Sequence, residues 1–161
     1  MRGVWNHEPQ GYDCPMCRIQ RGVENDRNRA ADVVAVTPLA FARVSPTCWP
    51  GNPGNALVLP RAHHENLYDL PPEVGHAVGD LVQQVAVAMR STYDCEGIST
   101  RQHNEPAGGQ DVWHLHVHVF PRHEGDRLYQ RHEIAREAFA PERATYADLL
   151  AGALGMPRTF S

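Results

Sequence analysis

The sequence predicts an α+β fold in which helices cover one antiparallel sheet. Its apolar segments follow one another in the order strand, strand, strand, helix, strand, strand, with short turns between them. A second helical pattern closes the chain, and 161 residues are enough for one domain around a single core. We therefore expect a single domain over residues 1–161, with a five-stranded antiparallel sheet, a long helix and a C-terminal helix.

The composition is that of an ordinary globular protein, and it excludes several classes of function. Hydrophobic residues make up 42% and charged residues 21% of the chain. The formal net charge is −4 and no block of basic residues occurs, so no nucleic-acid groove or basic membrane patch is expected. No apolar run resembles a signal peptide or a membrane span, and we expect a cytoplasmic protein.

The first half of the chain supplies three of the expected strands. Residues 1–13 are expected to form a flexible arm, and the polar stretch after Cys14 to form a knuckle. Apolar and β-branched residues predict strands over 31–36, 39–44 and 55–59. The segment 45–55 contains three prolines and two glycines, which predicts a loop without regular structure.

The second half begins with the clearest helix, over residues 71–93. Its two leading prolines suit a first helical turn, and Glu73 is placed favourably against the helix dipole. Apolar residues recur at helical spacing and predict one buried stripe: Val74, Val78, Leu81, Val85, Ala88 and Met89. Strands follow over 97–103 and 113–120. A last helix is expected over 142–154, with an apolar side of Tyr146, Leu149, Leu150 and Ala153.

Three alternating histidines in the last expected strand carry the strongest functional signal. In an extended strand His114, His116 and His118 share one face, and the apolar residues between them share the other. The apolar face can cover a core, so the opposite face presents three groups that titrate near neutrality. Packing alone hardly explains this alternation, which indicates a reactive or ligand-binding surface.

A glycine-rich loop precedes the histidines and predicts a phosphate site. Gly108 and Gly109 allow backbone N–H groups to approach an anion closely. Asn104 and Gln110 belong to the same loop. Donors beside a nucleophilic imidazole can neutralise the charge that develops on a phosphorus centre.

Cys14 and Cys17 have the two-residue spacing of a metal-binding half-site or of a redox pair. No export signal accompanies the four cysteines, so a disulfide framework is not expected. Cys48 and Cys95 stand alone and are expected to be small packing residues.

These patterns together resemble the histidine-triad (HIT) superfamily, in particular its Hint-like and Fhit-like hydrolase branches. The resemblance rests on Cys14-Pro-Met-Cys17, on the segments 56–63 and 66–70, and on the stretch 107–122 with its three histidines. It implies a HIT-like fold whose core covers residues 14–122, a C-terminal extension over 123–161, and a homodimer.

The resemblance implies a nucleotidyl hydrolase that acts at the α-phosphate of a nucleoside phosphoramidate, a dinucleoside polyphosphate or a related nucleotide conjugate. His116 would be the nucleophile and form a nucleotidyl-histidine intermediate, which divides one difficult displacement into two. His118 would contact phosphoryl oxygens or assist the leaving group. Gln110 would place the phosphate and the attacking water, and Asn104 would line the same pocket.

Three positions depart from the family pattern and bear on the substrate. Arg43 stands where an acidic residue or asparagine usually holds the ribose, and Asn55 stands where a histidine is common. Asp111 replaces the usual serine or threonine. Because a carboxylate repels a phosphate, Asp111 must point away, pair with a cation such as Arg43, or signal a different substrate. The expected substrate-binding set is Asn104, Gly108, Gly109, Asp111 and Arg43.

The resemblance also implies a structural zinc ion held by Cys14, Cys17, His63 and His114. Two thiolates and two imidazoles complete a tetrahedral shell with no open position. Such a site would tie the N-terminal knuckle to the sheet. His64 lies directly beside His63 and is an alternative fourth ligand.

Three other functions remain open from the sequence. A nucleotidyltransferase would pass the same intermediate to an acceptor other than water, although the related uridylyltransferase branch has glutamine where His118 stands. A non-catalytic, zinc-stabilised nucleotide-binding module would account for Arg43 and Asp111. A metal bound by all three alternating histidines would conflict with the glycine loop and the separate cysteine pair.

Overall fold

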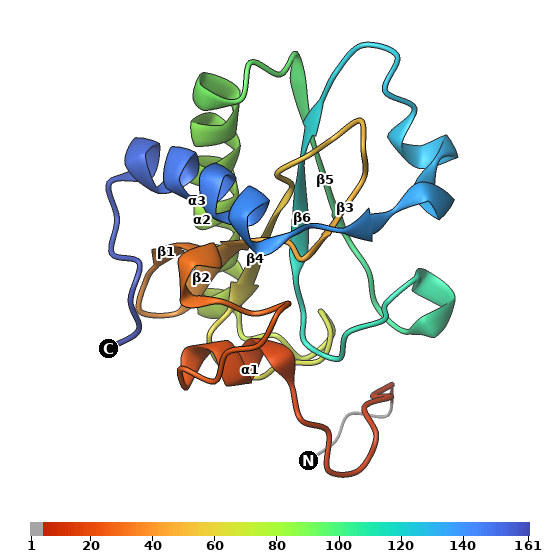
Figure 1. Ribbon diagram of the computed structural model, residues 1–161. Helices are drawn as coiled ribbons and strands as arrows, with labels where there is room; N and C mark the ends of the chain where they lie inside the picture. The colour runs from red at the N-terminus through yellow and green to blue at the C-terminus, as the bar shows by residue number, and fades with distance from the viewer. Residues whose placement is uncertain (1–4) are drawn as a thin grey trace.

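The computed structural model describes residues 5–161 and contains one five-stranded antiparallel sheet with the order β1-β2-β4-β6-β5 (Figure 1). Its strands are β1 (Val33–Val36), β2 (Ala40–Val44), β4 (Ala56–Pro60), β5 (Gly97–Gln102) and β6 (Val117–Arg122). The predicted α+β class and the five-stranded antiparallel sheet are confirmed.

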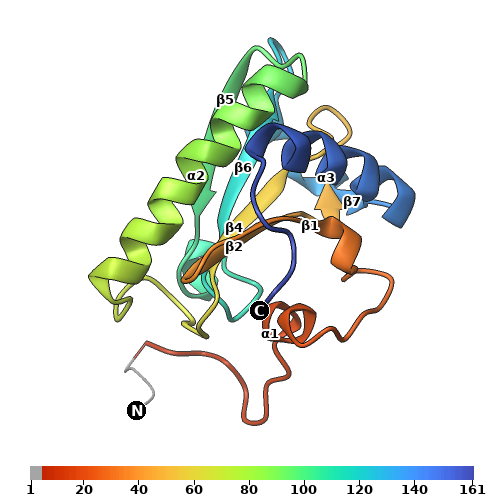
Figure 2. The same ribbon diagram turned by 90° about the vertical axis from the view of Figure 1, so that its left-hand side faces the viewer.

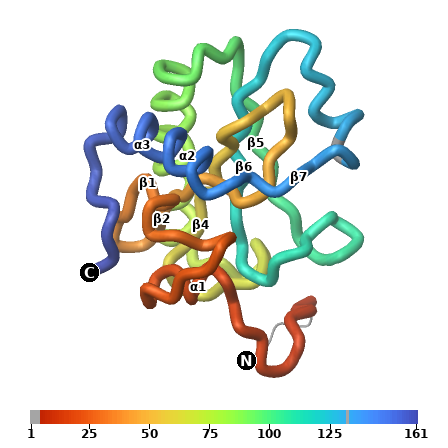
Figure 3. The backbone as a smooth tube through the Cα atoms, in the orientation of Figure 1, coloured from red at the N-terminus to blue at the C-terminus, as the bar shows by residue number. Residues whose placement is uncertain are grey.

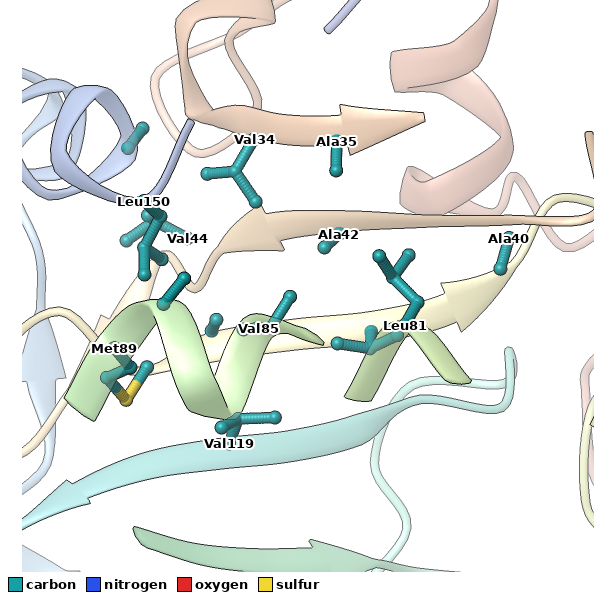
Figure 4. Close-up of a cluster of buried hydrophobic side chains, with 14 of the residues drawn as sticks. Val34, Ala35, Ala40, Ala42, Val44, Leu81, Val85, Met89, Val119 and Leu150 are labelled. Carbon is teal, nitrogen blue, oxygen red and sulfur yellow. The ribbon is translucent and has the colours of Figure 1, made fainter. Parts of the chain in front are cut away.

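Two helices, α2 (Pro72–Thr92) and α3 (Ala140–Leu154), cover one face of this sheet (Figure 2). The buried residues of α2 are the six that its helical spacing predicts. Figure 4 shows Leu81, Val85 and Met89 of α2 pointing onto the strands, with Leu150 of α3 beside them. The long helix is therefore held by the stripe that its sequence displays.

The two faces of the sheet serve different purposes, as β2 shows. Ala40, Ala42 and Val44 pack into the core beneath the helices. Phe41, which alternates with them, belongs to a second cluster with Met16 on the opposite side. Small residues on the helix side let α2 and α3 approach closely. The other face remains available for a site.

The strand that carries the histidines begins later than its sequence predicts. β6 starts at Val117, because its first pairings are with Val58 of β4 and Gln102 of β5. Before that point the chain leaves the ladder, and the N–H of Leu115 donates to the carbonyl of His64 at 2.7 Å. The expected strand over 113–120 is therefore wrong at its start, which frees the preceding histidines from strict alternation.

The expected apolar side of the last helix is confirmed at Leu150 and Tyr146, which pack in and against the core, and is wrong at Leu149 and Ala153, which are exposed. Leu149 is 42% exposed, whereas Arg143, Ala147 and Leu150 are buried. The Arg143 guanidinium donates to the Asp32 carboxylate from inside the protein, at 2.8 Å. A long-range ion pair, which periodicity does not reveal, thus sets the rotation of α3.

Two shorter expectations need correction as well. The loop predicted over 45–55 contains a two-residue strand, β3 (Thr47–Cys48), which pairs with β7 (Arg136–Glu137). The strand expected from residue 31 begins at residue 33, after a 3-10 turn. The 3-10 turns are η1 (Ala30–Asp32), η2 (Pro106–Gly108), η3 (Leu128–Gln130) and η4 (His132–Ile134).

The N-terminal arm and helix α1 (Pro15–Gln20) run along the end of the molecule where the loop between β5 and β6 turns back (Figure 3). The expected arm over 1–13 lies outside the described residues for its first four positions. From residue 5 onward it is fastened to the body, because the Glu65 carboxylate accepts the N–H groups of His7 and Glu8, each at 2.7 Å. Among the described helices, none combines the length and the apolar character that a membrane span requires.

Candidate active site and metal centre

A cavity of ≈ 420 Å³ opens on the sheet face opposite to the helices. Its volume falls in the range of small-molecule sites, roughly 300–1,000 Å³. His116, His118, Arg101, Asp111 and Trp49 are among the residues that line it. A reactive imidazole, two kinds of charge and an aromatic surface thus meet in one enclosed space.

His116 is held so that one specific nitrogen faces this cavity. Its Nδ1 lies 2.7 Å from the carbonyl oxygen of His114, which can only accept, so Nδ1 carries the proton. Nε2 is then left with its lone pair. His116 is only 7% exposed. This burial lowers the pKa of the imidazole and keeps the ring neutral. A neutral imidazole with a free Nε2 has the properties of a nucleophile.

His118 stands beside it in a ladder of rings. Its ring centroid lies 5.0 Å from that of His116, and 5.4 Å from that of Phe120, on which it stacks at 9°. Burial, followed by the nearby His116 and Arg101, lowers the pKa of His118 well below its usual range. Its Nδ1 is buried without a hydrogen-bond partner in the described part of the chain. His118 is therefore a neutral ring with unused hydrogen-bonding capacity.

Gln110 lies beneath the loop and does not line the cavity. Its Oε1 accepts the N–H of Glu105 at 2.9 Å, and its Nε2 donates to the carbonyls of Glu65 at 2.5 Å and Val112 at 3.1 Å. The side-chain amide is thus engaged in holding the loop. Its placement differs from the expectation that Gln110 reaches the phosphate and the attacking water.

The glycines of this loop are explained by close approach more than by open N–H groups. The N–H groups of Gly108, Gly109 and Gln110 all donate to carbonyls within the loop, so they do not form the expected anion cradle. Gly109 has φ +90°, and a Cβ there would lie 3.0 Å from Nδ1 of His103. Glycine is required because the loop folds against this imidazole.

The other substrate residues expected from the sequence divide between two places. Gly109 and Asp111 line the cavity with the histidines. Asn104 and Gly108 line a separate hollow beside the N-terminal arm, and Oδ1 of Asn104 accepts the N–H of Leu67 at 2.8 Å.

Arg43 is fully buried beside the cavity without lining it. Its guanidinium pairs with Asp32 at 3.1 Å and donates to Asn28 and to the carbonyl of Arg27. Together with the hydrogen bond from its Nε to the carbonyl of Val44, these contacts hold the Arg43 guanidinium inside the protein and away from the cavity. The expectation of a substrate-binding Arg43 is corrected, because an internal carboxylate captures the side chain.

Arg101 is the lining residue that sequence reasoning missed most clearly. It lies directly opposite His118 in the β5–β6 ladder, and directly opposed residues share a face of the sheet. Alternation within the expected strand 97–103 could have placed Arg101 on that face. The sequence could not supply the register between β5 and β6, and this register is what places Arg101 opposite His118.

Four side chains at the other end of the histidine segment converge on a common point. The ligand atoms of Cys14, Cys17, His63 and His114 all lie within 4.8 Å of one another. Nδ1 of His114 is 3.3 Å from Sγ of Cys14 and 3.2 Å from Nδ1 of His63. A tetrahedral zinc ion would separate sulfur from nitrogen by about 3.6 Å and two nitrogens by about 3.3 Å. The four residues fit such an ion.

Outer contacts orient both imidazoles toward this point. Nε2 of His114 donates to the carbonyl of Pro60 at 2.9 Å, and Nε2 of His63 lies 2.7 Å from the Glu8 carboxylate. Each contact leaves Nδ1 to face the cysteines, as outer-shell partners do for metal-binding histidines. A hydrogen bond from the Cys14 thiol, followed by the contacts of Cys17 with His114 and His63, lowers the pKa of the Cys17 thiol. The group therefore favours the thiolate that binds a metal.

Two alternatives to this ligand set are not borne out. His64, the neighbour of His63, is not part of the converging group. His116 and His118 are also outside it, so among the described residues no metal site contains all three alternating histidines. Within residues 5–161, the one group that could hold a metal combines the cysteine pair and His63 with only the first histidine of the row.

Comparisons with known proteins agree with this architecture. The model of the HIT domain matches residues 26–125. The protein hit of Bacillus subtilis is 34% identical over 70 residues, 44% of this chain and 48% of that protein. The adenylylsulfatase HINT3 of Arabidopsis thaliana is 26% identical over 126 residues, 78% of this chain and 60% of that protein. The chain thus spans about half to three fifths of the length of these curated relatives.

Solved structures extend the similarity over most of the chain. A Hit-like protein from Bartonella henselae has a TM-score of 0.76 at 27% identity, covering 90% of this chain and 100% of that one. A zinc-bound histidine triad family protein from Mycobacterium smegmatis has a TM-score of 0.71 at 26% identity, covering 89% of this chain and 94% of that one. The sequence and structure comparisons thus point to the same family.

Proposed function

The chain belongs to the HIT domain family, and from that premise we propose that it is a nucleotidyl hydrolase acting at the α-phosphate of a nucleotide conjugate. The observation that carries this proposal is the hydrogen bond from Nδ1 of His116 to the carbonyl of His114, because it leaves Nε2 free beside the cavity. The adenylylsulfatase name of one relative fits a reaction at an adenylyl phosphorus.

The proposed reaction has two displacements at phosphorus. In the first, Nε2 of His116 attacks the α-phosphorus, and the bond from phosphorus to the leaving group breaks with its electron pair going to that group. A nitrogen leaving group takes up a proton from solvent and departs as ammonia or an amine. His118 assists by donating a hydrogen bond to the leaving atom or to a phosphoryl oxygen. In the second, a water oxygen attacks, the phosphorus–nitrogen bond breaks, and the water proton passes to solvent. Two easier steps replace one difficult step.

The test is hydrolysis of adenosine phosphoramidate, adenosine 5′-phosphosulfate and diadenosine polyphosphates, with release of AMP as the readout. We expect turnover by the wild type, none by His116→Ala, and wild-type rates for His76→Ala, an exposed histidine on α2. Mass spectrometry of quenched protein should detect an adenylyl adduct that the His116→Ala variant lacks. Failure of the wild type to cleave any of these conjugates would instead support the nucleotide-binding module.

The metal centre is proposed to hold one structural zinc ion through Cys14, Cys17, His63 and His114. The donor set of two sulfurs and two nitrogens, and their separations, support this assignment. When bound, the ion would join α1 to the histidine segment. None of its four ligands lines the cavity, so no catalytic step is assigned to it. Metal analysis should find about one zinc per chain.

A homodimer is the proposed assembly, on the family resemblance. β5 is an edge strand of the sheet, so one side of it is available for pairing with a second copy. Light scattering should give the mass of two chains, and the mass of one chain would contradict this proposal.

A further inference from the structure

We propose that Arg101 binds a second anionic group of the substrate, so that this site selects conjugates whose leaving group is a phosphate or sulfate oxyanion. The inference rests on the proposed hydrolase function. It adds the chemical class of the leaving group, and with it a residue that determines specificity.

The position of Arg101 supports a role beyond the reacting phosphorus. Its guanidinium carbon lies 4.6 Å from the ring centroid of Phe120 and 5.2 Å from that of Trp49. Phe120 follows His118 on β6, and the two rings are stacked. The Arg101 guanidinium therefore lies toward the Phe120 end of the row of rings, beyond His118 and farther along than His116. A substrate whose phosphorus contacts His116 would reach Arg101 only with a group attached to that phosphorus.

The cations around the cavity differ in how much of their hydrogen bonding is already used. Arg27 pairs with Glu137 and donates to Thr47 at 3.2 Å. In contrast, Arg101 has no ion pair or hydrogen bond to the described residues, and its Nε is buried without a partner. Arg101 thus keeps its donors available for a ligand.

The surroundings of Arg101 make an anion a favourable partner. Burial lowers the pKa of Arg101, and Tyr129 and Asp111 oppose that shift. A cation that is partly removed from water gains more from pairing than an exposed one. Trp49 and Phe120 contact its guanidinium through cation–π interactions, which hold the group without occupying its N–H donors.

The chemistry of the guanidinium distinguishes two kinds of leaving group. Its planar fork of N–H donors matches two oxygens of a phosphate or sulfate. A phosphoramidate that releases ammonia or an amine offers no such oxygens, and Arg101 would stay unpaired. The exposed Asp111 carboxylate lines the same cavity and would disfavour an anion that failed to reach Arg101. The site therefore favours a conjugate with a correctly placed oxyanion.

The kinetic experiment compares Arg101→Gln with wild type on three substrates. Adenosine 5′-phosphosulfate releases sulfate, diadenosine triphosphate releases ADP through a phosphate oxygen, and adenosine phosphoramidate releases ammonia. Because hydrogen bonds to charged groups contribute about 1.5–3 kcal/mol, we expect kcat/KM to fall about 10–100-fold on the oxyanion conjugates. The value for adenosine phosphoramidate should change less than about threefold. The difference between sulfate and triphosphate identifies which oxyanion Arg101 prefers.

The matched control is Arg61→Gln, because Arg61 also lies over an aromatic ring, that of Phe160 at 5.6 Å, but does not line the cavity. It should leave the ratio of the three kcat/KM values unchanged. Arg101→Lys keeps the charge and should retain part of the preference. Equal losses of Arg101→Gln on all three substrates would overturn the inference, since Arg101 would then act on the α-phosphate or on the shape of the cavity.

A binding measurement separates this inference from the proposed function. Calorimetry should show that the wild type binds ADP more tightly than AMP, and that Arg101→Gln removes this difference while both proteins melt at similar temperatures. This outcome supports Arg101 even if no conjugate is hydrolysed, in which case only the hydrolase proposal fails. Equal affinity of the wild type for ADP and AMP, or no binding of either, would overturn the role of Arg101.

Discussion

Two histidines only two positions apart present opposite ring nitrogens to their surroundings. His114 donates from Nε2 to the carbonyl of Pro60 and turns Nδ1 toward the cysteines. His116 donates from Nδ1 to the carbonyl of His114 and leaves Nε2 for the cavity. The same side chain is thus a candidate metal ligand in one place and a candidate nucleophile in the other. The nearest carbonyl decides which, because it fixes the position of the ring proton.

The electrostatic surroundings of the two regions differ in the same way. Burial lowers the pKa of His116, and the hydrogen bond to the His114 carbonyl and the Asp111 carboxylate oppose this shift without cancelling it. At the metal centre, the hydrogen bond with Cys17 and the carboxylate of Glu8 raise the pKa of His63 to about 9, against burial. One region thus keeps an imidazole neutral, as the proposed nucleophile requires. The other surrounds an imidazole with anionic partners, which suit a divalent cation.

The largest expected effect is that of His116→Ala, which should abolish the activity of the cavity and leave the metal centre unchanged. His116→Ala should reduce kcat by on the order of 10³-fold or more, because no second nucleophile replaces Nε2. The zinc content should stay at about one per chain, since His116 is outside the converging ligand group. AMP release and elemental analysis measure these two quantities. Activity near that of the wild type would remove His116 from the mechanism.

Cys14→Ser should have the converse effect. The variant should lose its metal, and the free energy of unfolding should fall by about 4 kcal/mol when zinc is a thousandfold above its Kd. Turnover should remain measurable well below the melting temperature, because no ligand of the site lines the cavity. Cys95→Ser, at a buried thiol in the helix-side core, serves as the control and should keep the metal. Undiminished zinc in Cys14→Ser would contradict the assigned site.

Gln110→Ala tests the loop that borders the reacting region. It would leave the N–H of Glu105 and the carbonyls of Glu65 and Val112 without their partner. We expect a loss of about 2 kcal/mol in denaturant unfolding. Gln83→Ala, at an exposed position of α2, should change stability little. If Gln110→Ala lowered kcat with stability intact, Gln110 would act directly on the substrate.

Glu8→Gln tests the outer contact of the metal centre. The loss of the carboxylate beside Nε2 of His63 should weaken zinc affinity about tenfold. Competition with a chelator measures this change, and Glu73→Gln on α2 provides an exposed control. An unchanged affinity would show that Pro60 and the cysteines suffice to orient the site.

The smallest expected effect is that of pH near neutrality. The lowered pKa values of His116 and His118 keep both rings neutral at pH 6.5 and above. The value of kcat/KM should therefore be nearly constant from pH 6.5 to 8 and decline only on acidification. Below about pH 6.5 the unfolded chain binds more protons than the folded one at these two sites, so their contribution to stability is lost as the pH falls.

Rate profiles and denaturant unfolding across pH 5–8 measure both effects. Metal-free protein should show the opposite trend from His63, whose raised pKa contributes stability that is present below pH 6.5 and lost as the pH rises toward about 9. An acid limb centred at or above pH 6.5 would mean that the cavity does not hold its histidines neutral.

Local periodicity predicted the elements that depend on it. All six buried residues of α2 were predicted from the sequence, because the face of a helix that packs against a sheet must be apolar. The last helix was predicted with Leu150 on its buried face, but Arg143 and Ala147, which share that face, were missed. Arg143 turns inward only because Asp32, 111 residues earlier, supplies a carboxylate. The same carboxylate pairs with Arg43, which explains why Arg43 does not line the cavity as the sequence had suggested.

The sequence by itself determined the α+β class, the antiparallel sheet, the long helix and the two groups of reactive side chains. The elements follow from patterns of two and 3.6 residues, and the cysteine pair and the histidine row follow from their spacing. His63 and His114 were joined to the cysteines only by the resemblance to the HIT family. Only the tertiary structure decided which nitrogen each histidine presents and that Arg101 stands opposite His118. Those features depend on partners tens of residues away, such as Pro60 for His114, and no local pattern encodes such a partner.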